Sequence, residues 1–169
     1  MSKPNIGFIG LGLMGAAMVS RLQDLGYSMS ICANISRTNI DAAVARGACE
    51  VDTARQVAAA SDIIMLCMDT TASVEARMRG PEGVISGLSA GKIVIDFGTS
   101  LPASTRALGV EVAATGAQYL DAPLGRTPAH ARDGALNIMA SGEKNAFAAA
   151  KPVLQDLGEN VFHLGDLGS

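Results

Sequence analysis

The sequence is poor in aromatic and charged residues. Of its 169 residues, 4% are aromatic and none is tryptophan, while 17% are charged, against roughly 25% in an average soluble domain. Lysine and arginine total 13 and the acidic residues 16, which gives a net charge of −3. With neither a basic field nor a stacking platform, nucleic acid is not expected as a partner. The hydrophobic fraction of 49% excludes an intrinsically disordered chain.

Cysteines and long apolar stretches are also scarce. The three cysteines, Cys32, Cys49 and Cys67, are odd in number and lack CxxC spacing, so neither a disulfide framework nor a metal site is predicted. The longest run without charged or strongly polar residues, 6–19, is too short to span a bilayer. The glycines within this run argue against a signal peptide. The sequence therefore predicts a cytoplasmic protein with no membrane partner.

Short apolar segments alternate with segments of helical periodicity along the whole chain. Strands are predicted at 5–10, 28–33, 48–51, 62–68, 92–97, 118–121, 135–141 and 160–163. Helices are predicted at 13–25, 39–46, 53–60, 70–79, 102–116 and 143–157, with 122–133 as a loop. Proline lacks the amide hydrogen that a helix interior needs, so Pro152 should kink the last helix or force it to restart.

This alternation predicts an α/β fold of the Rossmann type, a doubly wound, mostly parallel sheet with helices on both faces. Nineteen glycines occur in the chain, but no linker, repeat or low-complexity segment separates one part from another. Residues 1–169 are therefore interpreted as one dinucleotide-binding domain.

A GxGxxG motif follows the first predicted strand and opens the first predicted helix. Its glycines are Gly10, Gly12 and Gly15. In this context the first glycine permits a tight turn, the second lets the backbone approach a pyrophosphate, and the third lets the helix pack close to the strand. The helix N-terminus then attracts the phosphates. The alternative is a glycine-rich turn that binds nothing.

The second half of the dinucleotide fingerprint is absent. An acidic residue at the end of the second strand would bind the ribose 2′-hydroxyl of NAD, but Ala33, Asn34, Ser36 and Arg37 occupy this stretch. Asn34, Ser36 and Arg37 are suited to surround a 2′-phosphate, with Arg37 as the counter-charge. The cofactor prediction is NAD or NADP, with NADP favoured. The alternative for Arg37 is a solvated loop cation.

Four segments resemble the β-hydroxyacid dehydrogenase family, which includes 3-hydroxyisobutyrate dehydrogenase and tartronate semialdehyde reductase. The opening GFIGLGLMG resembles the family's GFIGLGxMG, and IDFGTS at 95–100 resembles its D-x-[SG]-T segment. The third segment, DAP at 121–123 followed by DGAL at 133–136, resembles the family's substrate loop. The fourth, HLG at 163–165, resembles the close of its nucleotide domain.

The resemblance implies roles for particular residues around the cofactor. Those in the glycine motif are Gly10, Leu11, Gly12, Leu13, Met14 and Gly15, with Leu13 and Met14 against the pyrophosphate. Cys67 and Met68 would border the cofactor through their backbone, and Thr99 would contact the nicotinamide ribose. Ala33 holds a place where many members have Asp or Asn. The alternative for Thr99, together with Asp96, is capping of the next helix.

The substrate loop departs from the family pattern. Gly125, Arg126 and Thr127 stand where most members have Ser-Gly-Gly. Arg126 offers a planar fork of donors that suits a carboxylate or sulfonate, and Thr127 adds a hydroxyl. This triplet resembles the sulfolactaldehyde reductase branch, whose members reduce short anionic aldehydes. The alternative for Arg126 is an ordinary exposed loop arginine, and no role is assigned to His130 or His163.

The family's general acid–base is a lysine in a Gly-x-x-x-Lys-x-x-x-Asn segment, which these 169 residues lack. No catalytic residue is therefore predicted within them, and the family's helical domain is expected to be absent from this chain. The resemblance implies an NAD(P)-dependent oxidoreductase acting on short anionic aldehydes or hydroxyacids, homo-oligomeric as a full-length enzyme. The alternatives are a non-catalytic nucleotide-sensing module and a methyltransferase or other nucleotide-binding α/β fold.

Overall fold

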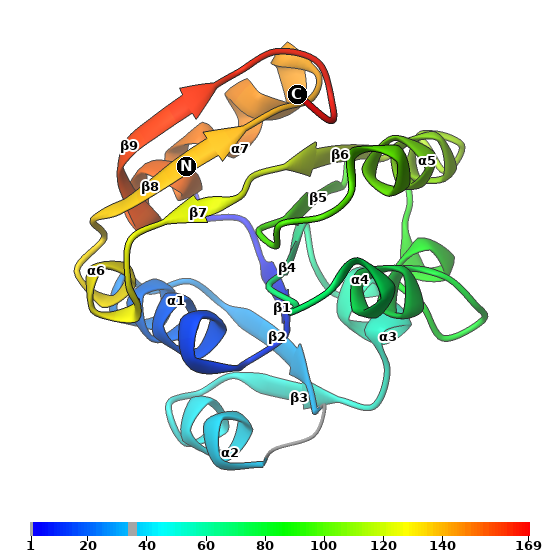
Figure 1. The fold of residues 1–169 in the computed structure, drawn as a ribbon. Coiled ribbons are helices and arrows are strands. Elements are labelled where there is room, and N and C mark those ends of the chain that lie inside the picture. Colours follow the sequence, from blue (N-terminus) through cyan, green and yellow to red (C-terminus); the bar gives the residue numbers. More distant parts are fainter. Residues whose placement is uncertain (1, 34–36) are drawn as a thin grey trace.

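A six-stranded parallel sheet forms the centre of the molecule (Figure 1). The computed structural model describes residues 2–33 and 37–169. The strand order is β3-β2-β1-β4-β5-β6. The strands are β1 (Ile6–Ile9), β2 (Met29–Cys32), β3 (Cys49–Val51), β4 (Ile63–Leu66), β5 (Ile93–Asp96) and β6 (Gln118–Asp121). The order and the parallel pairing confirm the predicted Rossmann-type sheet.

Helices cover both faces of this sheet, as the alternation predicted (Figure 1). One face carries α1 (Leu13–Asp24), α2 (Thr38–Ala45), α6 (Pro128–Arg132) and α7 (Lys144–Leu157). The other carries α3 (Ala54–Ala59), α4 (Thr71–Met78), the 3₁₀ turn η1 (Ile85–Gly87) and α5 (Pro102–Ala113). The central strands β1, β4 and β5 are buried throughout, because both of their faces pack against helices.

The C-terminal third departs from the predicted single sheet. β7 (Leu124–Gly125), β8 (Leu136–Ala140) and β9 (Gly158–His163) form a separate three-stranded sheet in which β7 runs antiparallel to β8. An isolated bridge between Asp121 and Ser141 joins the two sheets. Residues 122–133 were predicted as a loop, and this prediction is wrong, because β7 and α6 both lie within them.

Two local features explain these differences. Thr127 caps α6 and Pro128 takes its first position, an arrangement that starts a helix even within a short segment. Pro152 lies inside α7, which runs as one helix from Lys144 to Leu157. Of the two predicted outcomes, the restart at Pro152 is therefore wrong, and the kink stays a prediction. Burial of Val153, Leu154 and Leu157 against the core stabilises this half of the helix.

Candidate functional site

The carboxyl edge of the large sheet holds the candidate site. β1 and β4 are neighbours, but their following connections lead to strands on opposite sides, β2 and β5. Such a topological switch point leaves a crevice outside the strand ends, where ligands of doubly wound folds bind. The glycine motif joins β1 to α1 at this point.

The three glycines of the motif occupy different steric environments. Gly10 has φ +101°, and a Cβ there would lie 2.3 Å from the carbonyl oxygen of Cys67. A Cβ on Gly15 would lie 1.9 Å from the carbonyl oxygen of Gly10. A Cβ on Gly12, in contrast, would meet nothing within 4 Å. Packing explains Gly10 and Gly15, whereas the open space at Gly12 fits close approach of a pyrophosphate.

The remaining motif side chains point in different directions. Leu13, the first residue of α1, is 81% exposed, whereas Leu11 is buried and Met14 is half-buried against the core. The side-chain amide of Asn39 donates to the carbonyl oxygen of Leu11 at 2.9 Å. The first turn of α2 is therefore tied directly to the glycine-rich loop. Sequence reasoning missed Asn39, since nothing in the pattern of α2 singles it out.

The end of β4 packs on the same loop. The amide of Cys67 donates to the carbonyl oxygen of Ile9 at 2.9 Å, which places Cys67 and Met68 beside Gly10. Burial raises the pKa of the Cys67 thiol to about 11, so the thiol is neutral at physiological pH. Thr70 then caps α4 by accepting a hydrogen bond from the Ser73 amide.

The end of β5 carries a buried carboxylate. Asp96 accepts hydrogen bonds from the Gly98 amide at 2.9 Å and from the Ser100 hydroxyl at 2.7 Å. The N-cap of α5 is Leu101 and has no side-chain cap, so the alternative in which Asp96 and Thr99 cap this helix is wrong. Asp96 closes the turn instead and leaves Thr99 exposed at the sheet edge.

A second buried carboxylate faces Asp96 across the strand pair. Asp121 on β6 is in register with Asp96 on β5, and its Oδ1 atom has no hydrogen-bond partner among the described residues. Desolvation, with a further contribution from the charge on Asp96, raises the pKa of Asp121 to about 6. Burial likewise raises the pKa of Asp96. Two buried carboxyl groups close together disfavour simultaneous ionisation.

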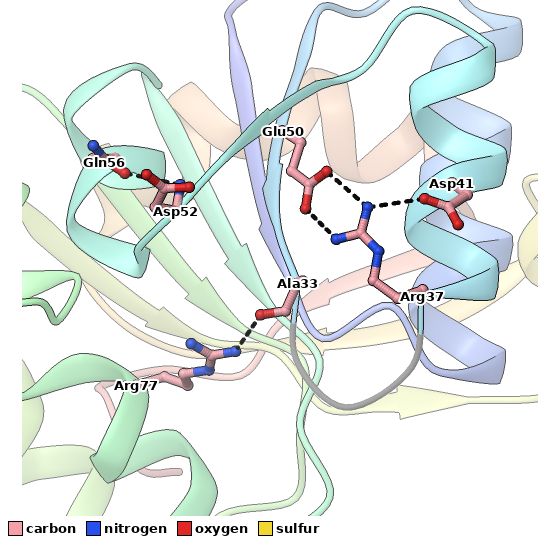
Figure 2. Close-up of polar contacts among 7 residues, drawn as sticks. All are labelled: Ala33, Arg37, Asp41, Glu50, Asp52, Gln56 and Arg77. Atoms are coloured by element: carbon pink, nitrogen blue, oxygen red, sulfur yellow. Dashed lines mark hydrogen bonds and ion pairs between the residues drawn. The ribbon is translucent and has the colours of Figure 1, made fainter.

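The end of β2 holds the candidate residues for the adenosine side (Figure 2). Arg37 forms ion pairs with Glu50 on β3, at 2.6 Å, and with Asp41 on α2, at 2.9 Å. Its predicted role as a counter-charge must therefore compete with two carboxylates. Arg77 reaches the same strand end from α4 and donates to the carbonyl oxygen of Ala33 at 3.2 Å. Asn34 and Ser36 lie outside the described residues.

The substrate-loop residues also make contacts within the protein. Arg126 has φ +82° and donates to Glu159 at 2.7 Å and to the carbonyl oxygen of Ala135 at 2.8 Å. Gly125 lies in β7, beside Asn137 of β8. The Thr127 hydroxyl caps α6 and lies 2.7 Å from the His130 ring. The three residues come together on one segment, but Arg126 and Thr127 already have partners.

Two further observations bear on ligands. Within residues 2–33 and 37–169, no group of three or more His, Cys, Asp or Glu side chains is arranged to hold a metal ion. Over the same residues, no helix combines the length and apolarity needed to cross a membrane.

The family described as the NAD binding domain of 6-phosphogluconate dehydrogenase matches residues 5–165. The chain belongs to this family of NAD-binding domains. Its curated relatives include 2-(hydroxymethyl)glutarate dehydrogenase of Eubacterium barkeri, 37% identical over 97% of this chain and 54% of the relative. Another is 2-hydroxy-3-oxopropionate reductase of Escherichia coli K12, 35% identical over 96% of this chain and 55% of the relative.

Solved structures agree with this membership. An imine reductase from Myxococcus stipitatus in complex with NADP⁺ superposes with a TM-score of 0.88 at 27% identity, covering 98% of this chain and 56% of the reductase. A variant of that enzyme is in complex with NAD⁺. The resemblance to β-hydroxyacid dehydrogenases is thus confirmed. This chain spans about half the length of the curated relatives it matches.

The geometry of this NAD-binding domain fits a dinucleotide. Gly12 leaves a cradle that a side chain would begin to fill, and it lies at the N-terminus of the twelve-residue helix α1. In the first turn of α1 no acidic residue opposes a phosphate. Sequence reasoning missed Glu50 and Arg77, because only the fold brings β3 and α4 to the end of β2.

Proposed function

We propose that the chain binds NAD or NADP along the carboxyl edge of its large sheet and positions it for hydride transfer with a short anionic aldehyde or the matching hydroxyacid. The observation that carries this proposal is the contrast within the glycine motif. Gly10 and Gly15 are sterically closed, whereas Gly12 opens onto unfilled space at the start of α1. When bound, the cofactor supplies the hydride chemistry, and the protein contributes position and electrostatics.

Each predicted cofactor residue has a place in this proposal. The loop from Gly10 to Gly15 would hold the pyrophosphate through backbone amides, with Leu13 and Met14 beside it. Cys67 and Met68 would border the cofactor on the β4 side, and Thr99 the nicotinamide ribose. At the adenosine end the residues would be Ala33, Asn34 and Arg37. The sequence-based preference for NADP depends on Arg37 and stays a prediction.

On the substrate side, Gly125, Arg126 and Thr127 would receive the anionic end of the aldehyde. Relatives named for small hydroxyacids and oxoacids support this class of substrate. The Arg126 guanidinium donates to Glu159 in the structure. An anionic substrate would have to replace the Glu159 carboxylate as its partner. Within this class, the Gly-Arg-Thr triplet favours a sulfonate such as sulfolactaldehyde.

The first experiment titrates the chain with NADH, NADPH and S-adenosylmethionine by calorimetry, using the wild type and Gly12→Ala. Gly12 has φ −77° and open space around it, so alanine is expected to leave thermal stability unchanged. It should lower dinucleotide affinity at least about tenfold, or ~1.4 kcal/mol. Binding of S-adenosylmethionine alone, or equal dinucleotide affinity in both proteins, would contradict the proposal.

A second experiment addresses the substrate. It measures steady-state kinetics of a protein that contains these residues together with the family's lysine segment. Arg126→Ala is expected to raise KM for anionic aldehydes about tenfold, a loss of ~1.4 kcal/mol. An uncharged aldehyde of similar size serves as the control and should show little change. Dinucleotide binding without any aldehyde reduction would instead favour a nucleotide-sensing module.

We further propose a homo-oligomeric full-length enzyme in the reducing cytoplasm. Cys32, Cys49 and Cys67 are all free thiols, which is in keeping with such a compartment. Sedimentation of the full-length protein and its localisation in cells test the two statements.

A further inference from the structure

The Arg37 guanidinium is held in a two-pronged ion pair. Its Nη1 donates to one carboxylate oxygen of Glu50 at 2.6 Å and its Nη2 to the other at 3.0 Å, while Nη2 also donates to Asp41 at 2.9 Å (Figure 2). Bidentate arginine–carboxylate pairs are stronger than single hydrogen bonds and also fix the relative orientation of the two groups. Arg77 also reaches this strand end, where it donates to the carbonyl oxygen of Ala33. The two arginines and the two carboxylates together carry no net charge, so the strand end that would face a 2′-phosphate is not positive.

The fold places this pair next to the cofactor edge. Glu50 on β3 is in register with Ile31 of β2. Ile31 lies two residues before Ala33, which follows the end of β2. Asn39, two residues after Arg37, donates to the carbonyl oxygen of Leu11 in the glycine-rich loop. The end of β2 is where the adenosine ribose of a bound dinucleotide lies in this fold.

We propose that Glu50 is a specificity-determining residue for the 2′ position of the cofactor, because its carboxylate occupies the Arg37 guanidinium. A 2′-phosphate would have to displace the Glu50 carboxylate before it could pair with Arg37. A ribose hydroxyl carries no charge and meets no such opposition. This inference rests on the proposed function, since it requires the dinucleotide to lie along this edge.

The contacts favour Glu50 over Asp41 in this role. Asp41, in α2, makes one contact with Arg37, the N-cap residue of that helix four positions earlier, and exposed i, i+4 pairs are weak. Glu50 lies on a different element and takes both terminal nitrogens of the guanidinium. Hydrogen bonding from Arg37 lowers the pKa of the Glu50 carboxyl, so its negative charge is present at neutral pH.

The test measures NADH and NADPH affinities by calorimetry for the wild type and four variants. Glu50→Gln is expected to raise affinity for NADPH relative to NADH about tenfold. Asp41→Asn removes the same charge from the same cluster and should change this ratio about twofold. Glu111→Gln is the matched control, because Glu111 forms a similar two-pronged pair with Arg79 away from β2. It should leave the ratio unchanged.

The double variant Glu50→Gln with Arg37→Met shows whether the gain in NADPH affinity depends on the Arg37 guanidinium. We expect the gain in NADPH affinity to disappear, with thermal melting confirming that each variant is folded. An unchanged ratio in Glu50→Gln, an equal gain in Asp41→Asn, or a gain that survives loss of Arg37 would each overturn the inference. In these cases the wild type still binds dinucleotide and the proposed function stands. A wild type that binds neither cofactor would overturn both.

Discussion

Two connections at the carboxyl edge of the large sheet differ in how far their functional groups already contact other parts of the protein. The glycine-rich loop between β1 and α1 has its close contacts at Gly10 and Gly15 and is open at Gly12. The segment between β6 and β8 has its polar groups engaged, with Arg126 on Glu159 and Thr127 capping α6. In the proposed function, the first connection would receive its ligand without losing an internal contact, whereas the second would have to exchange internal partners for one.

The difference shows which functional features a sequence reveals. A steric requirement for glycine follows from backbone geometry, so the pattern of spacing suffices to identify it. The partner of a charged side chain depends on which distant element packs beside it. Arg37 and Arg126 were both identified as anion-binding candidates, and in the structure each lies against a glutamate from a remote strand.

The largest effect is expected from Gly15→Ala. Its Cβ would lie 1.9 Å from the Gly10 carbonyl oxygen, so the loop or the start of α1 must shift. We expect a loss of about 3 kcal/mol or more in the free energy of unfolding, measured by urea denaturation. Gly12→Ala is the matched control and should change it by less than about 0.5 kcal/mol. Equal stabilities for the two variants would remove the steric distinction within the motif.

A smaller effect is expected at the start of the second segment, where Asp121 is buried. Because its pKa in the folded state, about 6, exceeds the ordinary value of 3.8, the folded protein binds a proton more tightly than the unfolded chain. The stabilisation from this proton is complete below about pH 4 and is lost as the pH rises through 6. The free energy of unfolding of Asp121→Asn should therefore equal that of the wild type at pH 4 and exceed it by about 1–2 kcal/mol at pH 7.

Urea denaturation across this pH range provides the measurement, and the exposed Asp133→Asn provides the control. A difference between wild type and Asp121→Asn that stays constant from pH 4 to pH 7 would show that Asp121 ionises normally. The second segment would then resemble the glycine-rich loop in lacking an unfavourable buried charge.

The smallest effect concerns the backbone of Arg126, where φ is +82°. Both Arg126→Gly and Arg126→Ala lose the guanidinium contacts, but only glycine relieves the left-handed backbone. Thermal denaturation should show the glycine variant more stable than the alanine variant by about 1 kcal/mol. Alanine equal to or more stable than glycine would mean that this backbone carries no strain.

The α/β class and the mostly parallel sheet were predictable because short apolar strands alternate with segments of helical periodicity. The helix predicted at 53–60 is likewise present as α3, where Thr53 and Gln56 form a capping box. The failures have a common cause. The loop predicted at 122–133 contains β7 and α6, and α7 continues through Pro152. In both places tertiary packing outweighs local propensity.

By itself, the sequence determined the α/β class, the position of the glycine motif and the apolar core, because each depends on local periodicity or on backbone freedom. Only the tertiary structure decided that Asp121 lies beside Asp96, that Arg126 meets Glu159 and that Glu50 holds Arg37. These pairs join residues from different elements. Their geometry follows from strand order and register, and no local pattern encodes either one.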